Sequence, residues 1–182
     1  SHSVWLQAMF EAEGDGLTIV ADIDAFPLSR AAFERLLEPA RAGGVAGLAQ
    51  VANHKNPDRL YAGPMFLAAG RDVYRALGRP AMARWDKGDV AQALTDAADA
   101  QGVPVSLTYP SFAIRPEWAL AQRGVFGIGT FYGDLEFFHL FQSRKRNSMQ
   151  LFVAVAEDVI AGRYDFARYI EIMRPRKWFG LI

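Results

Sequence analysis

The sequence predicts a mixed α/β fold, and two observations carry that prediction. Residues 17–21 form a short, apolar, β-branched run between turn signals, which indicates a buried strand. An amphipathic helix and a second apolar run follow, and this strand–helix–strand order is typical of an α/β layer. Since no repeat or low-complexity linker divides the 182 residues, we expect one domain over residues 1–182, or the C-terminal portion of one.

Cap and turn residues set the element boundaries in the first part of the chain. Ser29 has the side chain of a helix N-cap, and Gly43 with Gly44 ends the helix that follows, at about Ala42. The polar, turn-rich stretch at 52–64 predicts a loop. The other elements expected in this part are helices at 4–12, 71–77 and 89–100 and strands at 17–21, 45–51 and 65–68.

The second part of the chain is expected to be less regular. Residues 125–132 are rich in glycine and predict an irregular segment, and Pro110 is expected to end the strand before it. The elements expected here are strands at 103–109 and 135–141, a helix from the cap Asn147 to about Ala161, and a helix at 164–172.

Composition excludes several classes of protein. The chain has no cysteine, which excludes disulfides, thiolate catalysis and zinc–thiolate sites and fits a reducing compartment. The 20 basic and 20 acidic side chains balance, so we expect no nucleic-acid partner. No apolar run approaches the roughly 18 residues that span a bilayer, and no signal peptide is visible, so we expect a cytoplasmic protein without a transmembrane segment. Residues 1–3 are interpreted as a tag scar or the start of an excised fragment.

The charges are unevenly distributed along the chain. Residues 1–143 carry 12 basic and 16 acidic side chains, whereas residues 144–182 carry 8 and 4. The basic clusters are Arg144, Lys145 and Arg146, followed by Arg174, Arg176 and Lys177. Two interpretations stay open: a solvated face that keeps this part soluble, or an anion site, with phosphate as the favoured anion.

Two carboxylates directly follow the first predicted strand. Ligands bind outside the carboxyl ends of strands in open α/β sheets, and Asp22 and Asp24 occupy that position. Side chains two residues apart can both reach one hard divalent ion if the backbone turns, and Pro27 with the Ser29 cap predicts such a turn. The alternative is that both acids only cap the turn and the next helix. The sequence therefore indicates a candidate site for Mn²⁺ or Mg²⁺.

The stretch LTIVADIDAFPLS at residues 17–29 resembles the strand and D-x-D motif of GT-A-fold glycosyltransferases, where the motif holds Mn²⁺ or Mg²⁺ against a nucleotide-sugar diphosphate. Residues 61–66 resemble the N-x-G segment of the glycogenin and lipopolysaccharide galactosyltransferase group, although Ala62 and Pro64 depart from it. Trp85-Asp86 resembles the acidic D-Q-D segment of that group, without a match for its second acid.

The end of the resemblance lies in residues 138–145. Phe138-His139-Leu140 and the following Gln142-Ser143-Arg144-Lys145 resemble the family's late histidine and the basic residue after it. The resemblance implies that His139 is a third metal ligand and that Arg144 and Lys145 contact diphosphate. It also implies a GT-A-like mixed sheet flanked by helices. The family has two or three βα units before the D-x-D strand, where this sequence shows one helix, so either the chain is a piece of a longer protein or the base is held differently.

The remaining candidates are weighed against ordinary structural roles. His139 lies among aromatic residues, so it is either a core residue or a metal ligand, and a neutral imidazole with two carboxylates suits Mn²⁺ better than Ca²⁺. His54 is interpreted as a solvated loop residue. Gln50, Asn53, Tyr61 and Gly63 are candidates for sugar or acceptor binding, and Asp86 for a catalytic role toward the acceptor.

The leading hypothesis is a metal-dependent hexosyltransferase that moves a sugar from a nucleotide-sugar donor to a sugar, lipid or protein acceptor. One alternative is a Mg²⁺-dependent phosphotransferase of haloacid-dehalogenase type, which expects a lysine and a second acidic pair. The other is a GT-A-like interaction domain without catalytic activity. Phosphate-binding loops, dinucleotide fingerprints and hydrolase elbows have no matching glycine pattern in the sequence.

Overall fold

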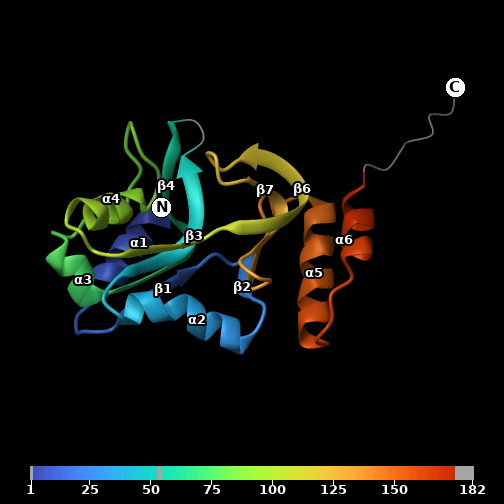
Figure 1. Ribbon diagram of the computed structural model, residues 1–182, viewed down its shortest axis with the longest axis horizontal. Helices are drawn as coiled ribbons and strands as arrows, with labels where there is room; N and C mark the ends of the chain where they lie inside the picture. Colours follow the sequence, from blue (N-terminus) through green and yellow to red (C-terminus); the bar gives the residue numbers. More distant parts are fainter. Residues whose placement is uncertain (1, 53–54, 175–182) are drawn as a thin grey trace, which may run out of the picture.

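The mixed α/β class is confirmed in the computed structural model, which describes residues 2–52 and 55–174 (Figure 1). The helices are α1 (His2–Glu11), α2 (Arg30–Arg41), α3 (Arg71–Ala76), α4 (Gln92–Ala100), α5 (Arg146–Ile160) and α6 (Phe166–Met173). The strands are β1 (Leu17–Ala21), β2 (Ala25–Pro27), β3 (Val45–Ala52), β4 (Asn56–Gly70), β5 (Val105–Thr108), β6 (Pro110–Ala119), β7 (Val125–Tyr132) and β8 (Phe137–His139). Within the described ranges, no helix is long and apolar enough to cross a membrane.

The first sheet has the strand order β1-β4-β3-β5. Helix α2 returns the chain so that β3 runs in the same direction as β1, and β4 lies between them, antiparallel to both. The α2 helix begins where the sequence predicts because the Ser29 hydroxyl accepts a hydrogen bond from the Ala32 N–H at 3.0 Å. Its buried face includes Leu36 and Leu37, which pack on the sheet.

The prediction of a loop at 52–64 is wrong over most of its length, because β4 already begins at Asn56. Polar residues such as Asp58 and Arg59 favour a loop in isolation, and the β3–β4 register shifts at this point. They still lie within β4, because Asn56 before them pairs with Ala52 and Leu60 after them pairs with Val51. The positive charge of Arg59 is also compensated from outside the strand, because its guanidinium pairs with Asp96 and Asp99 of the α4 helix.

The second sheet has the order β2-β8-β7-β6, and each neighbouring pair is antiparallel. Strand β5 ends at Thr108, just before Pro110, as the sequence predicts, and Pro110 begins β6, which belongs to the other sheet. The segment 125–132, expected to be irregular, is strand β7. Its glycines serve close packing: a Cβ on Gly127 would collide with the backbone of Arg115 in β6, which a glycine avoids.

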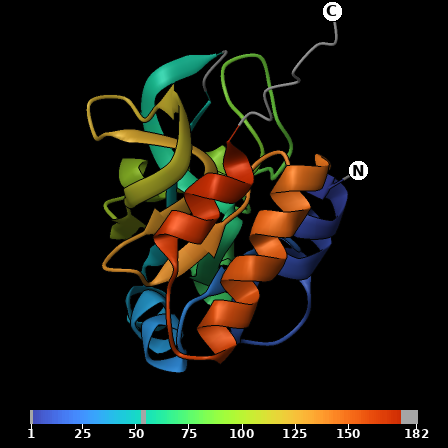
Figure 2. The same ribbon diagram turned by 90° about the vertical axis from the view of Figure 1, so that its right-hand side faces the viewer.

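The two sheets share aromatic core residues and are covered by helices on their outer faces. Phe66 of the first sheet packs on Phe137 of the second, with ring centroids 5.0 Å apart. On the other face of the second sheet, α5 and α6 lie side by side (Figures 1 and 2) and enclose Phe138, Phe131 and Tyr169. Burying one such side chain stabilises the fold by about 1.5–3 kcal/mol. Because the shared core holds the two sheets together, it also fixes the positions of β1 in the first sheet and β2 in the second.

Candidate metal centre

The connection between the two sheets carries the two acidic residues. Asp22, Ile23 and Asp24 link the end of β1 to the start of β2. The Asp22 N–H donates to the Met65 carbonyl at 3.2 Å, which extends the β1–β4 ladder, and the Ala25 N–H donates to the Asp22 carbonyl at 3.1 Å. Ile23 is 96% exposed, whereas both acidic side chains are partly buried. The turn therefore places the carboxylates inward and the isoleucine outward.

Strand pairing brings His139 to this turn from a distant part of the sequence. In the β2–β8 pair, Ala25 lies opposite His139, and the Leu140 N–H donates to the Asp24 carbonyl at 2.9 Å. His139 Nε2 lies 3.6 Å from Asp24 Oδ1. One ligand atom from each of Asp22, Asp24 and His139 lies within 4.8 Å of the other two. We call these three residues the Asp–Asp–His group.

The histidine is held in the interior with one edge toward the carboxylates. Its side chain is 6% exposed, and its ring centroid lies 4.0 Å from that of Phe141. Nδ1 is buried and has no hydrogen-bond partner within the described ranges. Since buried polar atoms are normally paired, this nitrogen is an unsatisfied atom on the ring whose Nε2 faces Asp24.

Burial and neighbouring groups shift the two carboxylates in opposite directions. Burial raises the pKa of Asp22, and the charge of Asp24 adds to that effect against the opposing influence of His139 and His2. Burial also opposes ionisation of Asp24, but hydrogen bonds from His139 and Ser143 outweigh it and hold the pKa of Asp24 below its usual value. A bound cation would relieve the repulsion between the two carboxylates.

The chain that leaves His139 carries the predicted diphosphate-binding residues close to the group. Ser143, whose side chain hydrogen-bonds Asp24, directly precedes the exposed Arg144 and Lys145. Lys145 is the N-cap residue of α5 and makes no side-chain capping bond in the described part of the chain. Asn147, the expected cap, lies inside the first turn. The helix therefore has first-turn N–H groups without a side-chain cap, and its dipole favours anions there.

The predicted sugar-binding residues lie on the β3–β4 hairpin, except Asn53, which falls outside the described residues together with His54. Gly63 lies two residues before Met65, the backbone partner of Asp22. A side chain at Gly63 would collide with Gln50 Oε1 and Met65 Sδ, so these two flexible side chains would have to move to admit one. Gln50 Oε1 is buried without a partner among the described residues. It is an unsatisfied acceptor enclosed within the protein.

Tyr61 and Asp86 have surroundings unlike those expected for them. Tyr61 is 0% exposed, so its ring offers no free face to a sugar, and burial, with the charge of Asp89, strongly raises its pKa. Asp86 is exposed in the turn between Trp85 and Gly88. In the described ranges it is not part of the Asp–Asp–His group.

Sequence reasoning missed two residues beside the group. His2, interpreted from the sequence as part of a scar, has its Nε2 3.8 Å from Asp22 Oδ1. Ser143 is not among the site residues predicted from the sequence. Its position between His139 and the basic residues 144–146 is the signal that could have identified it as a neighbour of the group. No protein-family model, curated protein or solved structure matches this chain, so the chemistry of the Asp–Asp–His group rests on its own residues.

Proposed function

We propose that the protein binds Mn²⁺ or Mg²⁺ at the Asp–Asp–His group and transfers a sugar from a nucleotide-sugar donor to an acceptor. The observation that supports this most is the convergence of Asp22, Asp24 and His139 at a strand end, although His139 is distant in the sequence. Two acidic residues alone, in a turn after a buried strand, would not indicate a metal site. The added imidazole makes it a set of three ligand atoms on two chain segments.

The spacing and chemistry of the group fit such an ion. Carboxylate oxygens are ligands that Mg²⁺ and Mn²⁺ accept, and imidazole nitrogen suits transition metals. Around an octahedral ion with bonds of about 2.1 Å, ligand atoms lie about 3 Å apart at neighbouring positions and about 4.2 Å apart at opposite ones. The 3.6 Å separation of Asp24 Oδ1 and His139 Nε2, and the 4.8 Å limit for the group, require only small side-chain adjustments.

Each residue near the group has a role consistent with glycosyl transfer. When bound, the ion supplies Lewis acidity toward the leaving nucleoside diphosphate. Asp22 and Asp24 provide the negative charge that holds a cation, and Ser143 orients Asp24 through its hydrogen bond. Arg144 and Lys145 add positive charge beside the α5 N-terminus, where diphosphate oxygens can accept hydrogen bonds.

Gln50 and Asp86, two other predicted site residues, differ in their relation to the Asp–Asp–His group. Gln50 stays a sugar-binding candidate for its unpaired Oε1, which is buried and has to be uncovered before it can accept from a hydroxyl. Asp86, which lies outside the Asp–Asp–His group, carries no part of the proposal. The phosphotransferase alternative has less support, because the group gathers a histidine and no second acidic pair in the described ranges.

The decisive experiment compares Mn²⁺ binding to the wild type and to Asp24→Asn by titration calorimetry. Asn keeps the size of the side chain and removes its charge, so affinity should fall at least about tenfold, the scale of a lost charged interaction. The matched control is Asp134→Asn, because Asp134 is an exposed carboxylate in the turn before β8. It should leave Mn²⁺ affinity unchanged.

A second measurement separates metal binding from catalysis. The wild type with Mn²⁺ should release nucleoside diphosphate from at least one member of a panel of nucleotide-sugars, and Asp24→Asn should not. Circular dichroism checks that the variant is folded. Equal Mn²⁺ affinity in Asp24→Asn and wild type would refute the metal site, and metal binding without donor turnover on the whole panel would favour the interaction-domain alternative.

A further inference from the structure

An open cleft of about 420 Å³ lies between the β3–β4 hairpin and the end of β6. Asp58, at the start of β4, contributes one wall, and Glu117 and Trp118 of β6 contribute the other. Gln122, in the turn between β6 and β7, closes one end. The cleft therefore combines one aromatic ring with carboxylates and an amide, and its volume lies in the range of small-molecule sites.

A β-bulge explains why two consecutive residues line the same cleft. The β6–β7 register shifts between Pro116 and Trp118, so Glu117 is an extra residue on β6. In a regular strand, consecutive side chains point to opposite faces, whereas a bulge redirects one of them. Glu117 and Trp118 are both cleft residues as a result. Bulges occur often beside active sites because they aim side chains in this way.

The Glu117 carboxylate is already oriented by neighbours. One oxygen pairs with Arg115 Nε at 3.1 Å, and the other accepts from Gln142 Nε2 at 3.3 Å. Each oxygen has a further lone pair, so the carboxylate can still accept a hydrogen bond from a ligand hydroxyl. Trp118 is fixed from behind by Phe126 and Phe141, with ring centroids 5.4 and 5.7 Å away.

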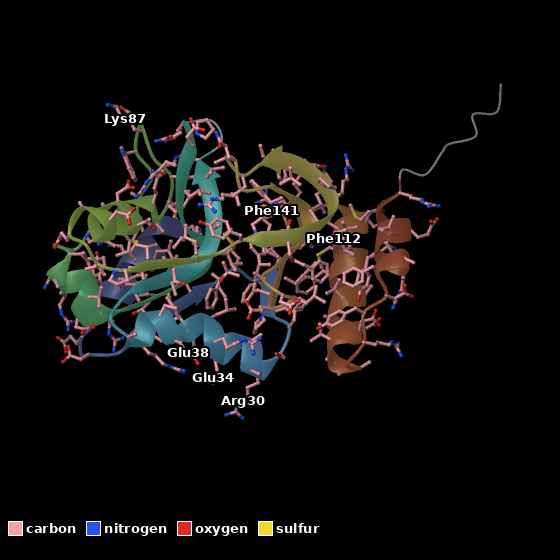
Figure 3. The ribbon with its side chains drawn as sticks, viewed as in Figure 1. Arg30, Glu34, Glu38, Lys87, Phe112 and Phe141 are labelled. Carbon is pink, nitrogen blue, oxygen red and sulfur yellow. The ribbon has the colours of Figure 1, made fainter. Side chains whose placement is uncertain are left out.

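Two sets of contacts connect this cleft to the Asp–Asp–His group. Phe141, which lies between the two sheets (Figure 3), packs on Trp118 and also on His139, at 4.0 Å between centroids. Gln142, the partner of Glu117, directly precedes Ser143, whose side chain contributes to the lowered pKa of Asp24. One short segment of chain, residues 141–143, therefore contacts both the cleft and the group.

We propose that this cleft is the acceptor subsite and that it binds a neutral sugar. The inference rests on the proposed glycosyl transfer. The indole offers an apolar face that matches the C–H face of a sugar ring, while Asp58, Glu117 and Gln122 provide hydrogen-bond partners for hydroxyls. The Asp58 carboxylate, which makes no ion pair with the described residues, disfavours an anionic ligand, whereas Glu117 is paired with Arg115. The α5 N-terminus is cationic by contrast, so donor and acceptor are distinguished by charge.

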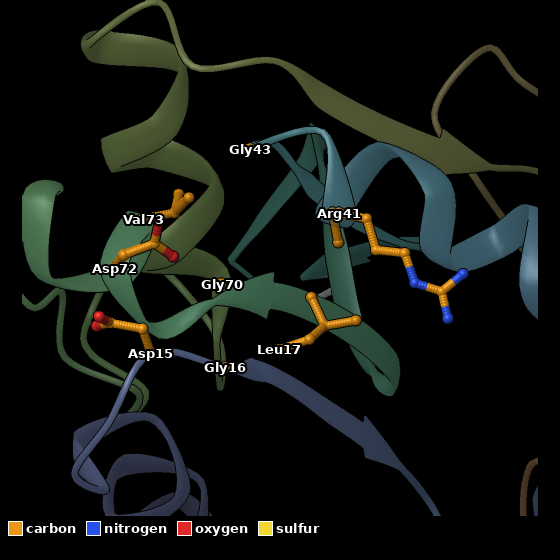
Figure 4. Close-up of a pocket in the computed structure, with 9 residues that line it drawn as sticks. Asp15, Gly16, Leu17, Arg41, Gly43, Gly70, Asp72 and Val73 are labelled. Carbon is orange, nitrogen blue, oxygen red and sulfur yellow. The ribbon is translucent and has the colours of Figure 1, made fainter.

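A second open cleft, of about 290 Å³, lacks these features. It lies at the start of β1 (Figure 4) and is lined by glycine backbone, by aliphatic side chains and by Asp15, Asp72 and Arg41. Asp15 is paired with Arg75, and Arg41, which points away from both acids in Figure 4, is paired with Glu34. No aromatic ring lines it in the described part of the chain.

The test measures binding of an array of neutral oligosaccharides, followed by titration of the best ligand with calorimetry as the readout, because the heat of binding does not depend on Trp118 as a reporter. The wild type should bind at least one neutral glycan, and Asp58→Asn should weaken that binding about tenfold or more, since it removes a charged acceptor. Trp118→Ala should abolish binding, whereas the matched control Trp5→Ala should not change it, because Trp5 is 73% exposed on α1.

Asp58→Asn keeps the proposal testable if Trp118→Ala fails to fold, because Asp58 is exposed. Mn²⁺ titration of the same variants separates this inference from the proposed function. Mn²⁺ binding and donor turnover with no glycan binding, or glycan binding unaffected by Asp58→Asn, would overturn the acceptor subsite and leave the function standing. Glycan binding that depends on Asp58 and Trp118, without any Mn²⁺ binding, would support the subsite and overturn the metal-dependent function.

Discussion

Gly129 of β7 lies against Leu151 of helix α5. Its backbone has a φ of +69°, which L-residues rarely adopt. A Cβ at this position would lie 2.6 Å from Leu151 Cδ2 of α5 and 3.2 Å from Ile114 Cγ1 of β6. Gly129→Ala therefore combines a backbone cost with a steric cost, and the two can be separated by a control.

The magnitude follows from these two contributions. Placing an L-residue in the left-handed region costs about 1–2 kcal/mol. Overpacking a core site costs about 1–3 kcal/mol more. Leu151 is fully buried, so relief of the contact requires α5 to shift and not merely a surface rotamer to change. We expect Gly129→Ala to lower the free energy of unfolding by about 2–5 kcal/mol in total.

Gly162→Ala is the matched control. Gly162 follows α5 with a φ of +66°, and a Cβ added there would meet no atom within 4 Å in the described ranges. It should show only the backbone cost, so urea unfolding followed by circular dichroism should find Gly129→Ala less stable by about 1–3 kcal/mol. Equal destabilisation of the two variants would refute the close packing of α5 on β7.

Two further predictions concern charge. Arg144→Ala combined with Lys145→Ala should weaken nucleoside-diphosphate binding by about 1.5–3 kcal/mol in calorimetry at low salt, and unchanged affinity would assign the cluster to a solvated face. A hydrogen bond from the Tyr169 hydroxyl, with Arg163, holds the pKa of buried Asp158 below its usual value against the effect of burial. This stabilisation is complete above the unfolded pKa of about 3.9 and is lost as the pH falls through the lower folded value. Tyr169→Phe should therefore reduce stability at neutral pH and flatten the acid side of the stability–pH curve, and an unchanged acid side in denaturation from pH 3 to 7 would contradict this role.

Local signals in the sequence were enough to predict the first strand and the helix after it. The strand Leu17–Ala21 has the expected bounds, because an apolar β-branched run between turns has few alternatives. The Ser29 cap is confirmed by its hydrogen bond to the Ala32 N–H. In these places the preference of the local sequence and the final packing agree.

The errors fall where distant chain segments decide the structure. The polar start of β4 and the glycine-rich β7 each lack the composition of a strand, yet each belongs to a strand that pairs with a neighbour. The glycines of β7 are explained by the approach of Arg115 backbone and Leu151, which no local pattern reveals. Composition describes a segment alone, whereas a strand depends on its partner.

The same distinction applies to the candidate metal centre. The two carboxylates are two residues apart and visible in the sequence, but the position of His139 depends on the β2–β8 register. That register pairs Phe26 with Phe138, and Phe138 packs under α5 and α6, while Phe137 packs on the first sheet. Alternation along the strand then gives His139 the face of Phe137. A slip of one residue would exchange these faces and turn the histidine away from Asp24, so the aromatic residues that build the core also fix the ligand geometry.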